Sequence, residues 1–268
     1  MGYRGFDLKL RKPEPASEME LMALPLLRIK PPQVQVALDM DASISTICDI
    51  AVKSYAGGAR VIEAGTPAIK RHGTDRLIKA LRRRISSYCR RNAIPNEAVI
   101  MADMKTMDVG NLEARIAYRS GADIVNVLGI GSVHKIREAL SEAIRGDRAI
   151  CVDLMQCPDP LAKVEEFAGE FKEFREWIML CMHKGISEQL KGRGIHEERS
   201  LLEEARRRSE GFMLAVAGGI YPGTAKEVAA AGADICVVGS AIYNSSDPED
   251  VTRMILEEIR ENDSRGRF

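Results

Sequence analysis

One short segment combines two acids and a lysine at a spacing that suits proton chemistry. It reads ADMKTMD over residues 102–108 and follows an apolar run. Side chains two residues apart face the same side of a strand, so Asp103 and Lys105 would meet if the strand continues through them. A lysine beside carboxylates stays protonated, and it can protonate a developing carbanion or stabilise an enediolate. The alternative is a surface salt bridge at a strand–helix junction, with Asp108 as the helix N-cap.

A further acid, Glu63, ends the apolar run that precedes Asp103 in the chain. Two carboxylates at the ends of adjacent strands repel each other unless a cation or a proton lies between them. A hard divalent ion such as Mg²⁺ suits such a pair, with waters or substrate oxygens completing its shell. The pattern therefore favours a metal site at Glu63 and Asp103. The alternative is that Glu63 pairs with Lys105 or Arg60 and binds no metal.

Two glycine turns near the C-terminus are typical of phosphate binding. They contain Gly218 and Gly219 in AGGI (217–220), and Gly239 and Ser240 in VGSA (238–241). Glycine lets a phosphate approach backbone N–H groups, and a helix N-terminus favours an anion. The occurrence of two such turns favours a phosphate site over glycines that serve only tight turns.

Other polar residues also end apolar runs. His183 could transfer a proton or bind a substrate hydroxyl, although a lone histidine is more often structural. A single acid after a strand, such as Asp39 or Asp153, is more often a helix cap or a turn former. Their joint position at strand ends is harder to explain by capping.

The elements that must position these residues form a repeating pattern. Short apolar runs rich in valine and isoleucine alternate with stretches of helical periodicity, as expected for buried parallel strands. The eight runs are VQVALD (34–39), RVIEAG (60–65), AVIMAD (98–103), DIVNVL (123–128), AICVDL (149–154), WIMLCMH (177–183), FMLAVAGG (212–219) and DICVVG (234–239). Eight units predict a single (β/α)₈ TIM barrel over residues 34–268, with its chemistry at the carboxyl ends of the strands. An open doubly wound sheet is the alternative.

Residues 1–33 differ from the rest of the chain in being rich in proline and charge. They predict a short N-terminal arm rather than a core element, because proline removes backbone donors and fixes φ. Within the arm, residues 18–24 could form one short helix packed on the barrel.

Composition excludes several classes of protein. Of 268 residues, 45% are hydrophobic and 29% charged, and 39 basic residues balance 39 acidic ones. This balance predicts a folded protein without nonspecific nucleic-acid binding, which usually needs a basic face. There is no apolar run long enough for a membrane span and no secretory signal, so we expect a cytoplasmic protein. Six scattered cysteines with no CxxC pair argue against a zinc site or a disulfide framework.

The motifs together resemble a known family. The segments QVALD, EAGTPAIK, ADMKTMDVGNLEA, GADIVNVLG, AVAGGI and GADICVVGSAI occur in this order over about residues 34–260. They are similar to the orotidine 5′-phosphate decarboxylase superfamily of barrels. Within it, the stretch from Glu63 to Pro67 and the glutamate Glu113 resemble the branch of 3-hexulose-6-phosphate synthase and 3-keto-L-gulonate 6-phosphate decarboxylase.

The resemblance implies a homodimer that acts on a phosphorylated sugar. It implies Mg²⁺ near Glu63 and Asp103, Lys105 as the residue that stabilises and protonates an enediolate, and Asp108 reaching into the partner's site. It further implies that Asp39 contacts substrate hydroxyls and that His183 assists proton transfer. The phosphate-binding positions would be Gly218, Gly219, Gly239 and Ser240. The synthase adds formaldehyde reversibly to ribulose 5-phosphate, and the decarboxylase forms a similar enediolate by losing CO₂.

Departures from the family pattern help to choose between the two activities. The strand-six motif of the family reads H-x-G-x-D-x-Q, with arginine at its fourth place in the decarboxylase. Here Ile186 takes that place, Ser187 replaces the aspartate, and Ser240 stands where the decarboxylase binds phosphate with an arginine. We therefore expect a synthase-type aldolase. The alternatives are a decarboxylase of a 3-keto sugar-acid phosphate and a non-catalytic barrel that binds a sugar phosphate.

Overall fold

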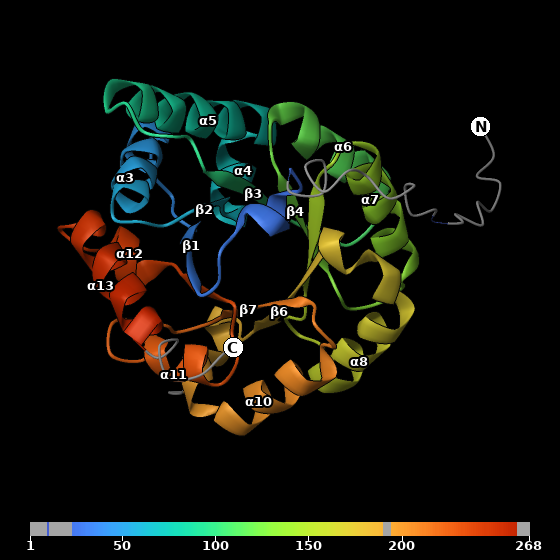
Figure 1. Cartoon of the computed structure of the whole chain (residues 1–268). Coiled ribbons are helices and arrows are strands. Elements are labelled where there is room, and N and C mark those ends of the chain that lie inside the picture. The colour runs from blue at the N-terminus through green and yellow to red at the C-terminus, as the bar shows by residue number, and fades with distance from the viewer. Residues whose placement is uncertain (1–9, 11–22, 190–193, 262–268) are drawn as a thin grey trace.

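Eight parallel strands form one closed barrel in the order of the chain (Figure 1). The computed structural model describes residue 10 and residues 23–189 and 194–261. The strands are β1 (Gln33–Leu38), β2 (Val61–Ala64), β3 (Val99–Thr106), β4 (Ile124–Leu128), β5 (Ala149–Asp153), β6 (Ile178–His183), β7 (Met213–Ala217) and β8 (Ile235–Val238). Strand β1 pairs with β8 and closes the ring. The predicted TIM barrel is confirmed, and an open sheet is excluded.

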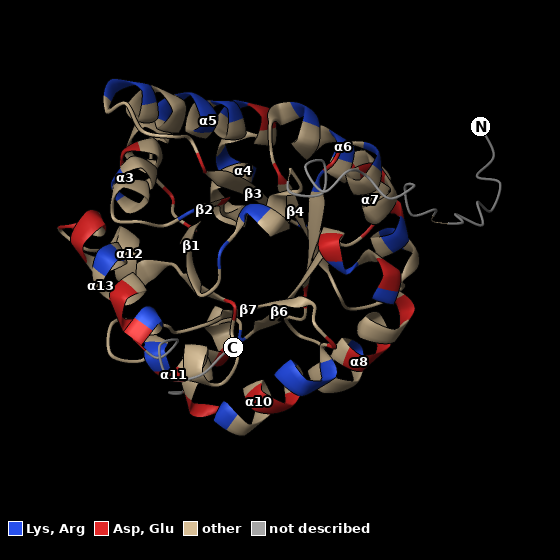
Figure 2. Cartoon of the chain, viewed as in Figure 1, with Lys and Arg blue, Asp and Glu red and all other residues tan. Residues whose placement is uncertain are grey.

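Helices cover the outside of the barrel. They are α3 (Ile44–Ala56), α4 (Thr66–His72), α5 (Thr74–Arg91), α6 (Gly110–Ser120), α7 (His134–Arg145), α8 (Pro160–Glu170), α9 (Ile186–Gln189), α10 (Arg199–Arg208), α11 (Ala225–Ala230), α12 (Ser240–Tyr243) and α13 (Pro248–Glu261), with 3₁₀ turns at Lys172–Trp177 and Ile195–Glu197. In α5, Leu77, Leu81 and Ile85 face the barrel. Lysines and arginines are frequent along this helix (Figure 2), and all of them except Arg82 are exposed. This amphipathic pattern explains why the strands are apolar on both faces.

A short helix, α2 (Pro25–Arg28), closes the end of the barrel at which the strands begin. Leu26 and Ile29 pack into the inner core with Val61 and Val99 at the first residues of their strands. The last third of the expected arm therefore contributes to the core, because apolar side chains are needed to fill the open end of the barrel. Of the helix expected at 18–24, residues 18–22 lie outside the described residues, and Ala23 and Leu24 form a turn before α2 rather than a helix.

A buried acid connects helix α2 to the barrel through ion pairs. Asp123, at the start of β4, forms ion pairs with Arg28 of α2 at 3.3 Å and with Arg148 at 3.0 Å, and it also pairs with Arg82. Its side chain is 3% exposed. One buried carboxylate therefore binds three arginines whose own side chains stay 27–35% exposed.

We expect Asp123→Ala to lower the free energy of unfolding by about 3 kcal/mol, because it removes a buried carboxylate that accepts from three partly exposed arginines and from the backbone N–H of Ile100. Denaturant unfolding measures this loss. The matched control is Asp49→Ala, which removes an exposed ion pair with Arg84 and should cost less than about 1 kcal/mol. Equal losses in the two variants would contradict the assignment.

All six cysteines carry free thiols, as expected. Within the described ranges, the helices include none that is both long and apolar enough to cross a membrane.

Candidate functional site

A pocket of about 350 Å³ lies at the carboxyl ends of the strands, with lining residues from all eight βα units. Nine of the ten residues expected at the site line it: Asp39, Glu63, Asp103, Lys105, His183, Gly218, Gly219, Gly239 and Ser240. The tenth, Asp108, does not. Residues as far apart in the sequence as Asp39 and Ser240 meet here, because the carboxyl ends of parallel strands open onto one mouth of the barrel.

An irregularity in β3 aims the lysine into this pocket. Between Ala102 and Thr106 the register of β3 against β4 shifts, so the strand does not continue regularly through the motif. Lys105 adopts a left-handed backbone conformation with φ of 48°. This conformation is costly for a side chain with a Cβ and occurs mainly where the surroundings enforce it, often at functional sites. The bulge lets Asp103 and Lys105 approach each other in the barrel mouth.

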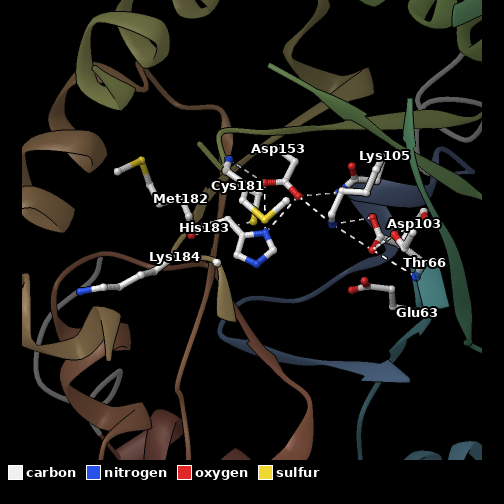
Figure 3. Close-up of polar contacts among 12 residues, drawn as sticks. Glu63, Thr66, Asp103, Lys105, Asp153, Cys181, Met182, His183 and Lys184 are labelled. Carbon is white, nitrogen blue, oxygen red and sulfur yellow. Dashed lines mark hydrogen bonds and ion pairs between the residues drawn. The ribbon is translucent and has the colours of Figure 1, made fainter. Parts of the chain in front are cut away.

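The ammonium of Lys105 lies between two buried carboxylates (Figure 3). Its Nζ donates to Asp103 Oδ1 and Oδ2 at 2.8 and 2.9 Å and to Asp153 Oδ2 at 3.0 Å. Burial lowers the pKa of Lys105, but the negative charges of Asp153, Asp103 and Glu63 outweigh burial and hold this pKa well above its ordinary value. The lysine is therefore a fixed positive charge, as the motif predicts.

Asp103 also belongs to a cluster of three acids on the side of the pocket away from Asp153. Oxygen atoms of Asp39, Glu63 and Asp103 lie within 4.8 Å of one another. Burial and then the charge of Asp103 raise the pKa of Asp39 from 3.8 to about 6. Burial, Asp103 and Asp39 also raise the pKa of the Glu63 carboxyl well above its usual range. Without a cation, the cluster therefore holds protons that isolated carboxyls would release.

Neighbouring residues hold these carboxylates in place. Thr66 Oγ1 donates to Asp103 Oδ2 at 2.7 Å, and the side-chain amide of Gln35 donates to Glu63. A Cβ at Gly65 would lie 2.1 Å from Asp39 Oδ1, so only glycine lets this acid approach. The carboxylates of Asp103 and Glu63 therefore each have a fixed hydrogen-bond partner.

The three acids fit a hard divalent cation. Carboxylate oxygens are the ligands that Mg²⁺ and similar ions prefer, and the amide oxygen of Gln35 is buried beside Glu63 without a partner among the described residues. A cation here would take the place of the protons that the cluster binds when no cation balances its negative charge. Each of these acids, the predicted Glu63 and Asp103 and also Asp39, thus offers one oxygen atom to a cation at this place.

The raised pKa values predict a pH dependence of stability. Between pH 3.8 and about 6 the folded chain binds more protons at Asp39 than the unfolded chain does, so stability falls as pH rises through this window. A divalent cation such as Mg²⁺ would offset this loss by binding the ionised acids. We therefore expect Mg²⁺ to raise the melting temperature by several degrees at pH 8 and by much less at pH 5.

Thermal melts with and without Mg²⁺ test this expectation. In Glu63→Gln the gain at pH 8 should fall sharply. An equal gain at both pH values would rule out the cluster as the binding site.

Asp153, which its sequence position alone would favour as a helix cap or a turn former, lies at the centre of the site. Its side chain is 1% exposed, and it accepts hydrogen bonds from Lys105, from Asn126 Nδ2 at 3.2 Å and from the backbone N–H of Met155 at 2.9 Å. The ring Nδ1 of His183 lies 3.0 Å from its Oδ2. Burial raises the pKa of Asp153, but His183 and Lys105 outweigh burial and hold it below its ordinary value.

Asp153 therefore joins the lysine to the histidine. Its only signal in the sequence was its place at a strand end, which Asp39 shares.

The opposite wall of the pocket carries the glycine turns. Gly218 and Gly219 have φ of 123° and 68°, and a Cβ on Gly218 would lie 2.5 Å from the carbonyl oxygen of Lys184. Ser240 begins helix α12 beside them. In helix α9, which follows β6, Ile186 lines the pocket, whereas Ser187 is exposed and is absent from the lining. A neutral wall that presents backbone groups thus faces the charged one.

Asp108 lies outside the pocket of its own chain. It is exposed and accepts a hydrogen bond from the N–H of Val109 at 2.8 Å. The first residue of α6 is Gly110, so Asp108 is not the helix N-cap. Met107 and Leu112 beside it are about half exposed, at 52% and 48%.

The comparison with known protein families agrees with this geometry. Residues 32–255 match the model of the orotidine 5′-phosphate decarboxylase / HUMPS family. The chain belongs to this family. The match spans every strand of the barrel, so the family resemblance seen in the motifs is confirmed.

Within the family the chain is similar to 3-hexulose-6-phosphate synthases. The synthase of Mycobacterium gastri is 35% identical over 81% of this chain and 94% of its own length. A bifunctional Fae/Hps enzyme of Methanococcoides burtonii is 31% identical over 84% of this chain, which spans 52% of that enzyme. A crystal structure of a 3-hexulose-6-phosphate synthase superposes with a TM-score of 0.67 at 31% identity and covers 86% of this chain and 99% of the other. The chain is a synthase-like member of the family.

Proposed function

We propose that the protein is a 3-hexulose-6-phosphate synthase-type aldolase that adds formaldehyde reversibly to ribulose 5-phosphate. The observation that carries the proposal is the position of Lys105, held as a fixed cation between Asp103 and Asp153 in a pocket whose far wall presents glycine turns. A cation in that place stabilises the negative charge that develops on the oxygens of an enediolate. The glycine turns would hold the substrate phosphate at the other end.

His183 is the base in this proposal. Its Nδ1–H donates to Asp153, which leaves the lone pair of Nε2 free to accept a proton. The base takes the proton from the carbon next to the carbonyl of ribulose 5-phosphate, and the electron pair of the C–H bond moves into the enediolate. Asp153 stabilises the imidazolium that results.

The carbon–carbon bond then forms without any further reagent. The enediolate carbon attacks the carbon of formaldehyde, the C=O bond opens to an alkoxide, and the alkoxide takes the proton from His183. Lys105 stays protonated throughout and balances the charge of the enediolate. All atoms of both substrates remain in the product, as an addition requires.

The three acids Asp39, Glu63 and Asp103 would hold Mg²⁺. When bound, this ion supplies additional positive charge for oxygens of the substrate. The carboxylates would hold the ion on the side of the pocket away from His183, since Glu63 and Asp103 lie across Lys105 from His183 (Figure 3).

Two positions favour the synthase over the decarboxylase. Ile186 and Ser240 line the pocket at the places where the decarboxylase pattern has arginine. Without an arginine at position 186 the wall offers no guanidinium to a substrate carboxylate, which formaldehyde does not need, and Ser240 cannot bind phosphate through a guanidinium as the decarboxylase pattern does. A complete acid–lysine–histidine arrangement also has no role in a barrel that only binds a sugar phosphate.

The test is consumption of ribulose 5-phosphate with Mg²⁺, with and without formaldehyde. The proposal requires turnover that depends on formaldehyde, and chelation should abolish it. Release of CO₂ from a 3-keto sugar-acid phosphate would instead establish the decarboxylase. Thermal stabilisation by ribulose 5-phosphate without any product would indicate the non-catalytic barrel.

We further propose a homodimer with the exposed face of α6 at its interface, and the cytoplasm, where thiols stay reduced, as its compartment. Asp108 then reaches into the partner's pocket, while Met107, Leu112 and Ile116 lose their exposure. Light scattering should give a dimer for the native chain and a monomer for Leu112→Glu, because a buried unpaired charge opposes association. The control is Met254→Glu, on a helix away from this face, which should remain a dimer.

A further inference from the structure

A second group of metal-binding atoms lies across the pocket from the three acids. One ligand atom each of Asp153, Cys181 and His183 lies within 4.8 Å of the others. Strands β5 and β6 bring them together, since Asp153 pairs in register with Cys181 and His183 follows two residues later on the same face. Figure 3 shows Cys181 and His183 beside Asp153, while Lys184 points away from the group.

The spacing of these atoms is close to that in a metal site. Zinc bonds to sulfur, nitrogen and oxygen ligands are about 2.0 to 2.3 Å long, so ligands of a tetrahedral ion lie about 3 to 4 Å apart. His183 Nδ1 and Asp153 Oδ2 already lie 3.0 Å apart. Small side-chain rotations would bring the thiol of Cys181 to a suitable distance.

The thiol of Cys181 has only weak partners. Its Sγ lies 3.9 Å from the backbone oxygen of Met182, and the thiol of Cys151 lies beside it. The side chain is 4% exposed, yet it lines the pocket. The side-chain oxygen of Asn126, whose amide donates to Asp153, is also buried without a partner among the described residues. The group therefore has ligand atoms that its present contacts do not use.

The ligand types separate this group from the three acids. Sulfur and imidazole select softer ions such as Zn²⁺, whereas three carboxylates suit Mg²⁺. One wall of the pocket thus matches a hard cation and the other a soft one. Neither the aldol chemistry nor the binding of a sugar phosphate uses a thiol at this place.

We propose that Asp153, Cys181 and His183 form a binding site for Zn²⁺ or a cation of the same class, and that its occupation inactivates the enzyme. Binding replaces the thiol proton of Cys181, which is released to solvent, and the pocket leaves the fourth position open to water. The inactivation rests on the proposed function. Zn²⁺ occupies the carboxylate that pairs with Lys105 and the imidazole that serves as the base, so both lose their roles together.

Metal binding is tested apart from activity, with Co²⁺ and Zn²⁺ as the probes. We expect one equivalent of Co²⁺ per chain to produce a near-ultraviolet band of sulfur-to-cobalt charge transfer, and Zn²⁺ to remove it. The band should vanish in Cys181→Ser and persist in Cys236→Ser, which alters a buried thiol outside the pocket. It should also persist in Glu63→Gln, because the acid cluster is a separate site. Circular dichroism checks that each variant is folded.

A band that survives in Cys181→Ser, or none in the native chain, would overturn the site. Activity then tests the consequence, with each enzyme compared with its own rate in Mg²⁺ alone. Stoichiometric Zn²⁺ should reduce the native rate at least tenfold and a zinc-selective chelator should restore it, while Cys181→Ser keeps most of its own rate. Zinc binding without loss of rate would refute the inactivation, and a native chain inactive without zinc would refute only the proposed function.

Discussion

Lys105→Met should lower kcat for formaldehyde-dependent turnover by about 10³-fold. The ammonium is placed to balance the charge of an enediolate, and such electrostatic contributions are typically worth up to about 10³ in rate. Methionine keeps most of the length and volume of the side chain but carries no charge. Steady-state rates at saturating ribulose 5-phosphate measure the effect.

The same substitution should also lower the thermal stability of the protein. Without Lys105, Asp103 and Asp153 lose the partner at 2.8 and 3.0 Å that balances their charge. We expect a lower melting temperature that added Mg²⁺ partly restores, because the ion replaces some of the missing charge. Lys79→Met, which removes an exposed ion pair with Asp75, is the control and should change neither quantity appreciably. A Lys105→Met enzyme within tenfold of the native rate would contradict the mechanism.

Asp153→Asn should have the second largest effect, a loss of about 10² to 10³ in kcat, within the range typical of general acid–base catalysis. Asparagine keeps the shape of the side chain but removes the negative charge that orients both Lys105 and His183. The amide can also reverse the hydrogen bond to His183 and so favour the tautomer with its proton on Nε2, which cannot act as a base. The pH profile of kcat should change together with its size, which a purely structural role would not produce.

Asp123→Asn is the matched control for this variant. Both aspartates are buried and both accept from cationic side chains, but Asp123 lies at the amino-terminal end of the barrel. Its loss should lower the free energy of unfolding and leave the rate of the folded enzyme within about twofold. If Asp153→Asn behaved in the same way, Asp153 would be a structural residue.

The sequence alone determined the architecture and most of the site. Eight apolar runs separated by helical stretches match the eight observed strands to within a few residues, because burial on both faces leaves a clear signal in residue type. A barrel also places every carboxyl end at one mouth. Nine of the ten expected site residues therefore line the pocket without any knowledge of side-chain contacts.

Four features were decided only by the tertiary structure. Asp153 resembles a capping acid until β6 brings His183 beside it, and Cys181 resembles core filling until the same pairing places it at the pocket. The left-handed backbone at Lys105 accompanies an irregularity in β3 that the residue types of this segment do not predict. Leu26 and Ile29 fill the bottom of the barrel although their segment reads as an arm. In each case the deciding contact joins residues that lie on different strands or elements, and residue type and spacing describe only one element at a time.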